Sequence, residues 1–276
     1  MLVRRVIFLT GSDMNDVRPN ANDVFNKVPQ VTLIFWIVKI CATTVGETAA
    51  DVLSTTFHLG LVVTSYIMAA LLILALIAQF RTSRYVPAVY WTVVVFISVV
   101  GTLISDNLVD NLGVSLVTTT IIFTVALIVV FAWWYRSERT LSVHTIYTKR
   151  REAFYWGAIL FTFSLGTSGG DLLSEKLALG YAVALGIFAA GIALVYVLYR
   201  LHAIGGVLAF WLAYILTRPL GASAGDLLTQ APADGGFGIG RLVSTGVILL
   251  IIVALVWYMS VQENEHPQSA VAVDAQ

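Results

Sequence analysis

The sequence predicts an all-α polytopic membrane protein in which eight transmembrane helices form four parallel two-helix repeats, with pseudo-fourfold or nested pseudo-twofold symmetry. Hydrophobic residues make up 58% of the 276-residue chain and charged residues only 12%, whereas a soluble domain carries about 25% charged residues. Apolar stretches long enough to cross a bilayer follow one another along the chain. A tryptophan, a glycine and an aspartate recur at fixed spacing in every second stretch.

The two ends of the chain are predicted to lie outside the helical bundle. Residues 1–29 are polar apart from a short run, VIFLT, which is too short for a signal-peptide core or a spanning helix. We expect this segment to be a cytoplasmic N-terminal tail or a partly ordered arm, and residues 262–276 to form a disordered C-terminal tail. The chain has 16 Lys and Arg, 16 Asp and Glu, and one cysteine, Cys41. This composition excludes a nucleic-acid partner and any framework of disulfides or metal-binding cysteines.

Eight segments have the length of about 20 residues that a spanning helix needs. Four of them carry no charge: Leu59–Phe80, Leu112–Tyr135, Leu177–Tyr199 and Leu242–Val261. The other four, at 32–54, 87–108, 152–174 and 205–228, carry ionisable residues. One charged and one uncharged segment make up each repeat, which gives repeat 1 at 30–80, repeat 2 at 86–135, repeat 3 at 152–200 and repeat 4 at 205–261.

Basic residues collect on alternate connections between these segments. Arg81, Arg84 and Arg200 follow the second and sixth segments, and residues 136–151 form a basic loop between repeats 2 and 3. The remaining connections hold few cations. The positive-inside rule therefore places both termini and the basic loop in the cytoplasm.

The four charged segments share one pattern. Each contains a tryptophan directly after another aromatic residue: Trp36, Trp91, Trp156 and Trp211. A glycine follows ten residues after each tryptophan: Gly46, Gly101, Gly166 and Gly221. An aspartate follows fifteen residues after each tryptophan: Asp51, Asp106, Asp171 and Asp226. A pattern present in all four segments indicates an internal repeat.

The chain resembles a family of bacterial integral membrane proteins built from four tandem two-helix repeats of unknown function, each bearing a tryptophan. The matching segments read FWIVKICATTVGETAAD, YWTVVVFISVVGTLISD, YWGAILFTFSLGTSGGD and FWLAYILTRPLGASAGD. The resemblance covers about residues 30–261. It implies the architecture and a place in the bacterial inner membrane, but no activity, so the functional argument rests on the residues.

Each repeat has an even number of spans, so all four point the same way and are expected to be related by an axis along the membrane normal. The charged helices should surround this axis, and the uncharged helices should face lipid, which does not accommodate unpaired charge. With each tryptophan at the inner interface, the aspartate lies about 22 Å further along the helix, in the outer third of the hydrocarbon layer. The four aspartates should then form a ring that opens to the outside.

The repeat glycines are expected to let helices approach closely, because another small residue, such as Gly170 or Gly225, follows four positions later. A second role as hinges is left open, since a helix that opens beside an aspartate exposes carbonyl oxygens to a cation. Arg218 and Pro219 stand just before Gly221, and proline removes a helix hydrogen bond. The segment at 205–228 is therefore the best candidate for a break.

Seven carboxylates on the charged segments form the candidate cation- and proton-binding set: Asp51, Asp106, Asp171, Asp226, Glu47, Asp110 and Glu175. Lys39 and Arg218 lie deeper and are candidate counter-charges for the empty site. Lys39 is long enough to reach the inner interface, whereas Arg218 should pair with an acid from another repeat. Ionisable residues within spans mark ion or proton pathways. The alternatives are that these charges only hold the bundle together, or that the aspartates cap helices or face interfacial water.

All candidate ligands are oxygen atoms, which suit hard cations such as Mg²⁺, Mn²⁺, Ca²⁺, Na⁺ or H⁺. The four repeat aspartates are therefore also a candidate metal site. The sequence has no Walker A motif, no HExxH and no nucleophile elbow. We expect neither an enzyme nor a cofactor.

These residues predict a proton-linked exporter of a small hard cation, divalent or monovalent, whose partners are the lipid bilayer, the cation and protons, with homo-oligomerisation left open. The first alternative is a passive cation channel along the repeat axis, against which Lys39 and Arg218 argue because fixed cations impede cation passage. The second is a non-transporting sensor or partner subunit. In that case the basic loop at 136–151 docks a cytoplasmic protein or anionic lipid instead of only fixing the topology.

Overall fold

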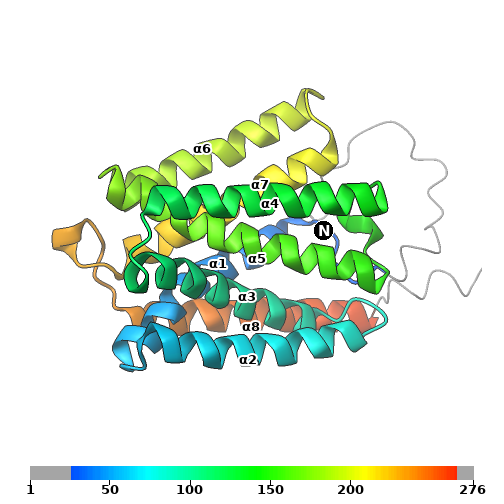
Figure 1. The fold of residues 1–276 in the computed structure, drawn as a ribbon. Helices are drawn as coiled ribbons and strands as arrows, with labels where there is room; N and C mark the ends of the chain where they lie inside the picture. The colour runs from blue at the N-terminus through cyan, green and yellow to red at the C-terminus, as the bar shows by residue number, and fades with distance from the viewer. Residues whose placement is uncertain (1–25, 266–276) are drawn as a thin grey trace, which may run out of the picture.

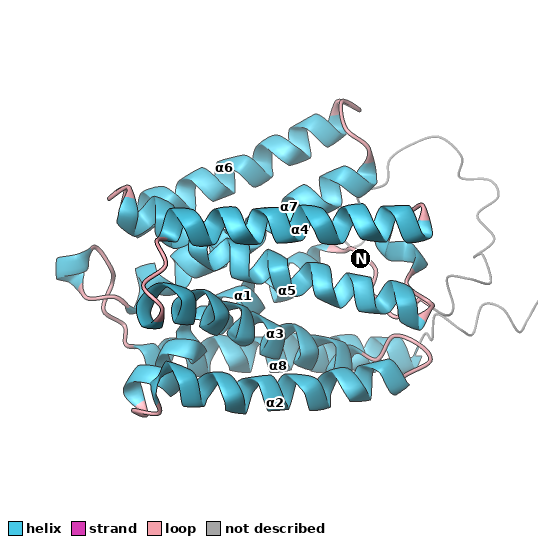
Figure 2. Cartoon of the chain, in the orientation of Figure 1, coloured by secondary structure: helices cyan, strands magenta, loops and turns pink. Residues whose placement is uncertain are grey.

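The computed structural model describes residues 26–265 as a bundle of eight long α-helices that lie along one common direction (Figure 1). Within these residues only helices and loops occur, and no strand (Figure 2). The first helices of the four repeats are α1 (Leu33–Asp51), α3 (Pro87–Asp106), α5 (Lys149–Asp171) and α7 (Gly206–Thr229). The second helices are α2 (Gly60–Arg81), α4 (Leu116–Glu138), α6 (Tyr181–Arg200) and α8 (Arg241–Glu265).

Five short helical segments complete the described chain. Three are π-helices, η2 (Val52–Thr56), η3 (Asn107–Asn111) and η5 (Leu172–Lys176). The other two are 3₁₀-helices, η4 (Val143–Thr145) and η6 (Pro232–Asp234).

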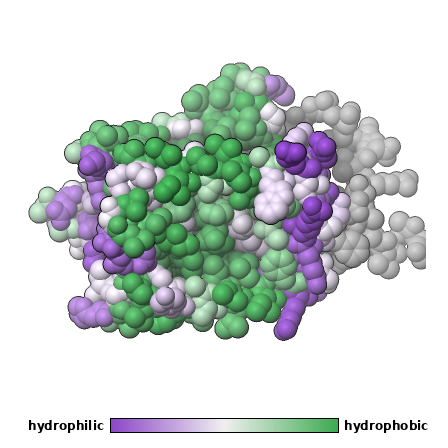
Figure 3. Space-filling view, in the orientation of Figure 1, coloured by the Kyte–Doolittle hydropathy of each residue, from purple (hydrophilic) through white to green (hydrophobic). Residues whose placement is uncertain are grey.

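Seven of the eight long helices are long and apolar enough to cross a membrane. The exception is α5, because small and polar residues fill its second half, as in Leu165–Asp171, which reads LGTSGGD. The predicted span at 152–174 is thus a long helix, but a less apolar one than expected. A broad hydrophobic belt separates two hydrophilic ends on the face shown in Figure 3. The chain is therefore membrane-like in composition and in surface pattern.

The first helices of the repeats form a closed ring, in which α1 packs on α3, α3 on α5, α5 on α7 and α7 on α1. Each second helix packs mainly against the first helix of the following repeat: α2 on α3, α4 on α5, α6 on α7 and α8 on α1. In each second helix 17% of the apolar window is buried, against 56–67% in α1, α3 and α7. The charged helices therefore lie inside and the uncharged ones outside.

Local signals place several helix starts. Thr32, Ser115 and Thr148 precede α1, α4 and α5, and their side-chain oxygens accept a hydrogen bond from the backbone N–H three residues later. Pro87 opens α3, where the N–H that proline lacks would have no helical partner. These caps fix the ends of the helices, and packing fixes their order around the bundle.

The structure describes a short part of each predicted tail. Of the segment 1–29, predicted as a cytoplasmic tail or a partly ordered arm, it describes Asn26–Pro29, which are buried, and the Lys27 ammonium bonds the Glu152 carboxylate at 2.7 Å. Gln79 donates to the other oxygen of Glu152, at 3.1 Å, so this buried cluster anchors the chain before α1. At the other end α8 continues to Glu265, so a helix covers the first residues of the segment 262–276 that was predicted as a tail. Residues 1–25 and 266–276 lie outside the described residues.

Candidate functional site

The side chain of Arg218 lies fully buried at the centre of the ring of first helices. Its Nη2 donates to Glu47 Oε2 at 3.0 Å and to Thr167 Oγ1 at 2.7 Å, and also to the hydroxyl of Thr102. Its Nη1 donates to the carbonyl of Thr43 at 3.3 Å. The acid from another repeat that the sequence required for Arg218 is therefore Glu47.

The partners of Arg218 come from equivalent positions of the other three repeats. Glu47, Thr102 and Thr167 each stand eleven residues after the repeat tryptophan, and repeat 4 has Ala222 at that position. One guanidinium from α7 thus joins α1, α3 and α5 at a single level. A buried arginine with this many partners is a fixed cation on the axis of the ring.

The repeat glycines mark where neighbouring first helices come closest. A Cβ added at Gly46 would collide with Ser98, and one added at Gly221 would collide with Thr43. A Cβ at Gly101 would lie 2.7 Å from Cβ of Phe163, and one at Gly166 would overlap Arg218. Ser98, Phe163, Arg218 and Thr43 all stand seven residues after the tryptophan of their repeat. Each repeat glycine therefore packs against the residue at the same repeat position, seven after the tryptophan, of the next first helix in the ring.

The hinge role that was left open for these glycines does not appear as a break in the described helices. All four glycines lie within continuous α-helix, and α7 also runs unbroken through Pro219. Gly170 and Gly225, the small residues four positions after two of the repeat glycines, also lie within α-helix. A Cβ added at Gly225 would stand 3.2 Å from the methyl group of Thr48. The prediction of a helix break at 205–228 is wrong. The helix α7 packs between α1 and α5, and the hydroxyl of Thr43 on α1 donates to the carbonyl of Thr217 on α7.

The departure from α-helix occurs instead directly after three of the repeat aspartates. Asp51, Asp106 and Asp171 are the last α-helical residues of α1, α3 and α5, and a π-helix follows each of them. None of the three makes a side-chain capping hydrogen bond to that segment, which disfavours a capping role. In repeat 4, α7 continues past Asp226 to Thr229 with no π-helix. Wide π-turns of this kind are frequent at functional sites.

The predicted acids gather at the end of the bundle away from the tryptophans. Asp51 pairs with Arg241 at 3.0 Å, and Glu175 accepts a hydrogen bond from Tyr181 at 3.4 Å. Electrostatic interactions connect Asp106 with Asp51 and with Asp110. They also connect Asp171 with Asp106 and Asp226, and Glu47 with all four repeat aspartates. The acids from α1, α3, α5 and α7 therefore share one region.

This acid cluster has few counter-charges. In the described part of the chain Asp106, Asp171 and Asp226 form no salt bridge. No group of three or more His, Cys, Asp or Glu among residues 26–263 lies close enough to hold a metal ion. Within this range the repeat aspartates are therefore not close enough together to form a joint metal site. They form instead an acidic region next to the buried pair of Arg218 and Glu47, on the side away from the tryptophans.

The position of Lys39 differs from the sequence prediction. Lys39 does not reach the inner interface, since its side chain is fully buried. Its Nζ lies 4.0 Å from the ring centroid of Phe163 and 4.2 Å from that of Tyr214, and it has no hydrogen-bond acceptor. The faces of these two rings attract the ammonium and hold it within the bundle.

Replacing Lys39 with methionine is expected to raise the midpoint temperature of thermal unfolding by about 2–4 °C. An ammonium buried without an acceptor is costly, and contact with ring faces returns only about 2 kcal/mol of that cost. Methionine has a similar length and packs well on aromatic rings. Differential scanning calorimetry of the detergent-solubilised protein measures this shift in midpoint temperature. Lys176→Met, which replaces an exposed lysine, is the control. A lower midpoint for Lys39→Met would contradict the absence of a partner for the ammonium.

Aromatic side chains close the tryptophan end of the ring. The aromatic residue before each tryptophan contacts the tryptophan of the following repeat. The four pairs and their centroid distances are Phe35–Trp91 at 5.6 Å, Tyr90–Trp156 at 5.4 Å, Tyr155–Trp211 at 6.2 Å and Phe210–Trp36 at 5.8 Å. The hydroxyls of Tyr90 and Tyr155 bond each other at 2.5 Å. The centre of the bundle therefore has an acidic end and an aromatic end.

The sequence did not lead us to predict several of the residues that build the centre of the ring. Thr102 and Thr167 carry the signal that would have found them, because both share the offset of Glu47 from the repeat tryptophan. Phe163 and Tyr214, which enclose Lys39, do not share the offset of Glu47, and an aromatic residue in an apolar helix is ordinary core. Their role follows only from the way the helices pack.

The four-part organisation of the chain is also found by comparison with known families. No curated protein and no solved structure shows significant similarity to the chain. A family model described as Repeat of Unknown Function (DUF347) matches it four times, at residues 34–85, 89–140, 154–203 and 209–264. These matches coincide with the four pairs of helices that build the ring and its outer layer. The protein thus belongs to the DUF347 family of repeat proteins, whose function is unknown.

Proposed function

We propose that the protein is a secondary transporter of a small hard cation, coupled to protons and most simply an exporter. The acid cluster is its outer mouth, and the pair of Arg218 and Glu47 is its internal gate. The observation that carries the proposal is the burial of this ion pair on the axis of the ring, directly inside a cluster of carboxyls with few counter-charges. Charged groups buried in a membrane bundle are expensive and mark ion pathways.

In this mechanism Arg218 takes the place of the cation in the empty state. Glu47 is the carboxylate to which a cation on the axis would bind, and the guanidinium occupies it at 3.0 Å. A cation that reaches Glu47 displaces Arg218, so the two occupants exclude each other. Protons neutralise the outer carboxyls when the cation has left, because several acids without counter-charges cannot all stay ionised in apolar surroundings. Mutually exclusive binding of cation and proton couples their movements.

The arrangement of the membrane helices follows the same proposal. We place the chain in the bacterial inner membrane with eight spans, α5 among them, since its polar second half lies inside the ring. The cyclic packing of the first helices supports a pseudo-fourfold axis along the membrane normal. Both termini and the basic connections lie on the cytoplasmic side, so the acid cluster faces outward. We propose no enzymatic activity and no cofactor, and transport needs no partner beyond the bilayer, the cation and protons, whether or not the protein forms homo-oligomers.

Flux through proteoliposomes tests this function. Vesicles that contain a pH indicator receive a gradient of Mn²⁺, Mg²⁺ or Na⁺, and the wild-type protein is expected to move one of these cations with protons moving in the opposite direction. The double variant Asp171→Asn/Asp226→Asn should lose at least about tenfold in rate, because it removes two adjacent carboxyls from the mouth. Asp234→Asn, in the exposed η6 segment, is the matched control and should transport normally.

Three outcomes would contradict the proposal. Equal flux in the double variant and the wild type would remove the carboxyls from the mechanism. Cation current without proton movement would identify a passive channel. No flux of any of the three cations would favour a sensor or partner subunit that works through the basic loop at 136–151.

A further inference from the structure

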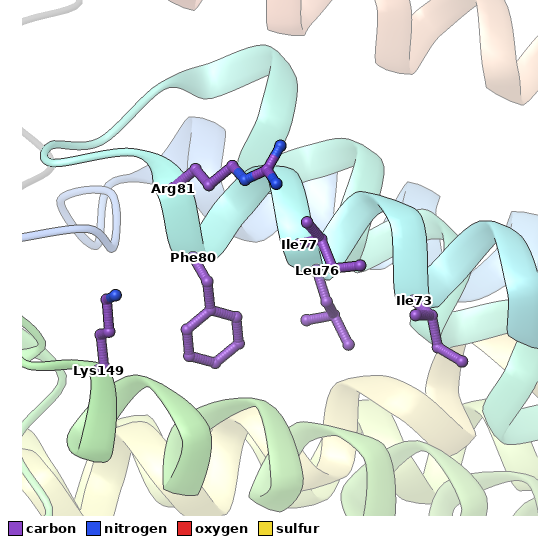
Figure 4. Close-up of a pocket in the computed structure, with 6 residues that line it drawn as sticks. All are labelled: Ile73, Leu76, Ile77, Phe80, Arg81 and Lys149. Atoms are coloured by element: carbon purple, nitrogen blue, oxygen red, sulfur yellow. The ribbon is translucent and has the colours of Figure 1, made fainter.

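A groove with an apolar floor lies on the outside of the bundle between α2 and the start of α5 (Figure 4). Four apolar side chains of α2 line it, namely Ile73, Leu76, Ile77 and Phe80. Arg81, the last residue of α2, and Lys149, the first residue of α5, lie at one end. The groove therefore combines an apolar floor with two cations at one end.

A second hollow continues the groove at its basic end. It shares Phe80, Arg81 and Lys149 with the first, and it adds Lys27, Thr82, Ser83 and Tyr147. Lysine, arginine and hydroxyl groups thus surround the end of the groove, while the apolar part follows α2 toward the middle of the bundle. The polarity changes along the groove as it does along a phospholipid.

The cations at this end differ in whether they are neutralised. Lys27 is bonded to Glu152 at 2.7 Å. Arg81 and Lys149 are exposed, and neither forms a salt bridge with any residue from 26 to 263. Two uncompensated cations attract an anionic group such as a phosphate.

The apolar part is exposed to the surroundings of the bundle rather than to its core. Ile73 is 56% exposed and Ile77 is 44% exposed. Both belong to α2, a helix of the outer layer, and α2 makes little direct contact with α5. In a bilayer these side chains lie at the depth of the acyl chains, and Arg81 and Lys149 lie at the depth of the headgroups.

We propose that this groove binds an anionic phospholipid, whose phosphate contacts Arg81 and Lys149 and one of whose acyl chains lies along Ile73, Ile77 and Phe80. The lipid fills the space between α2 of repeat 1 and α5 of repeat 3, and it stabilises the folded bundle by binding across the two repeats. The site needs only that the bundle lies in a bilayer, so it stands apart from the transport proposal.

Thermal unfolding of the delipidated protein in a neutral detergent tests the site. Phosphatidylglycerol is expected to raise the midpoint temperature by about 5 °C more than phosphatidylcholine does. The variant Arg81→Gln/Lys149→Gln should lose this difference. The control Arg84→Gln/Arg136→Gln removes two exposed arginines that do not line the groove, and it should keep the difference. Equal shifts with the two lipids in the wild type would overturn the proposal.

A second variant and inorganic phosphate separate the lipid from its headgroup. Ile77→Trp fills the apolar part of the groove and leaves both cations in place, so it should remove the stabilisation by phosphatidylglycerol. Inorganic phosphate at millimolar concentration should leave the wild-type midpoint unchanged. A shift by phosphate equal to that by phosphatidylglycerol, together with a normal lipid response of Ile77→Trp, would show that the site binds free phosphate and would overturn the lipid assignment.

Discussion

Replacing Arg218 with methionine is expected to lower the free energy of unfolding by about 3–5 kcal/mol. The substitution leaves the carboxylate of Glu47 buried without its cation, and the hydroxyls of Thr102 and Thr167 lose a shared donor. Removing one member of a buried ion pair is costly because the remaining charge has been taken from water without compensation. Reversible denaturation of the protein in mixed micelles measures the change.

The double variant Arg218→Met/Glu47→Met is the control for this prediction. Because both charges are removed, it should recover most of the lost stability. A double-mutant cycle over the two positions should give a coupling energy of about 3 kcal/mol. Arg218→Lys should remain unstable, since a single ammonium does not reproduce the planar guanidinium that reaches three side chains. Equal stability of the single methionine variant and the wild type would mean that the pair is solvated and is no gate.

Replacing Gly166 with alanine is expected to cost about 1–3 kcal/mol of stability, in spite of the better helix propensity of alanine. The new Cβ would lie 2.5 Å from Cβ of Arg218 and 3.0 Å from Cδ of Pro219. Those atoms belong to the packed part of α7 and cannot rotate away, so α5 and α7 must separate. The separation also displaces the guanidinium from Glu47. The midpoint of thermal unfolding and the flux should therefore fall together.

Gly169→Ala is the matched control, three residues further along the same helix. A Cβ there meets nothing within 4 Å, so only the gain in helix propensity remains, and stability should rise by up to about 1 kcal/mol. Similar effects of the two substitutions would contradict the close packing of α5 on α7 at Gly166. Gly101→Ala, which places a Cβ 2.7 Å from that of Phe163, should behave like Gly166→Ala.

The repeat pattern was sufficient to predict the number of long helices and the interior position of the charged ones. It was also sufficient to predict that a carboxylate from another repeat faces Arg218. The choice of Glu47 was not predictable, because several acids stand at similar depth and only the rotation of each helix decides which of them faces the axis. The offset shared by Glu47, Thr102 and Thr167 becomes informative once the ring of helices is known.

Two expectations failed for identifiable reasons. A break at Pro219 was predicted from the chemistry of proline alone, but α7 stays continuous at that point, packed between α1 and α5. Lys39 was expected to reach the interface because its side chain is long enough. In the folded chain the rings of Phe163 and Tyr214 come from other repeats and enclose its ammonium. Both failures come from contacts between repeats, which local sequence does not encode.

The sequence by itself determined a membrane-like chain of four two-helix units with an acid at the same place in each, since hydrophobic length and residue spacing are properties of the chain. Only the tertiary structure decided that each unit packs on the next and the last on the first, and that one arginine therefore meets three other helices at a single point. The physical reason is that glycine permits a close approach without specifying its partner. The partner is chosen when the helices close into a ring.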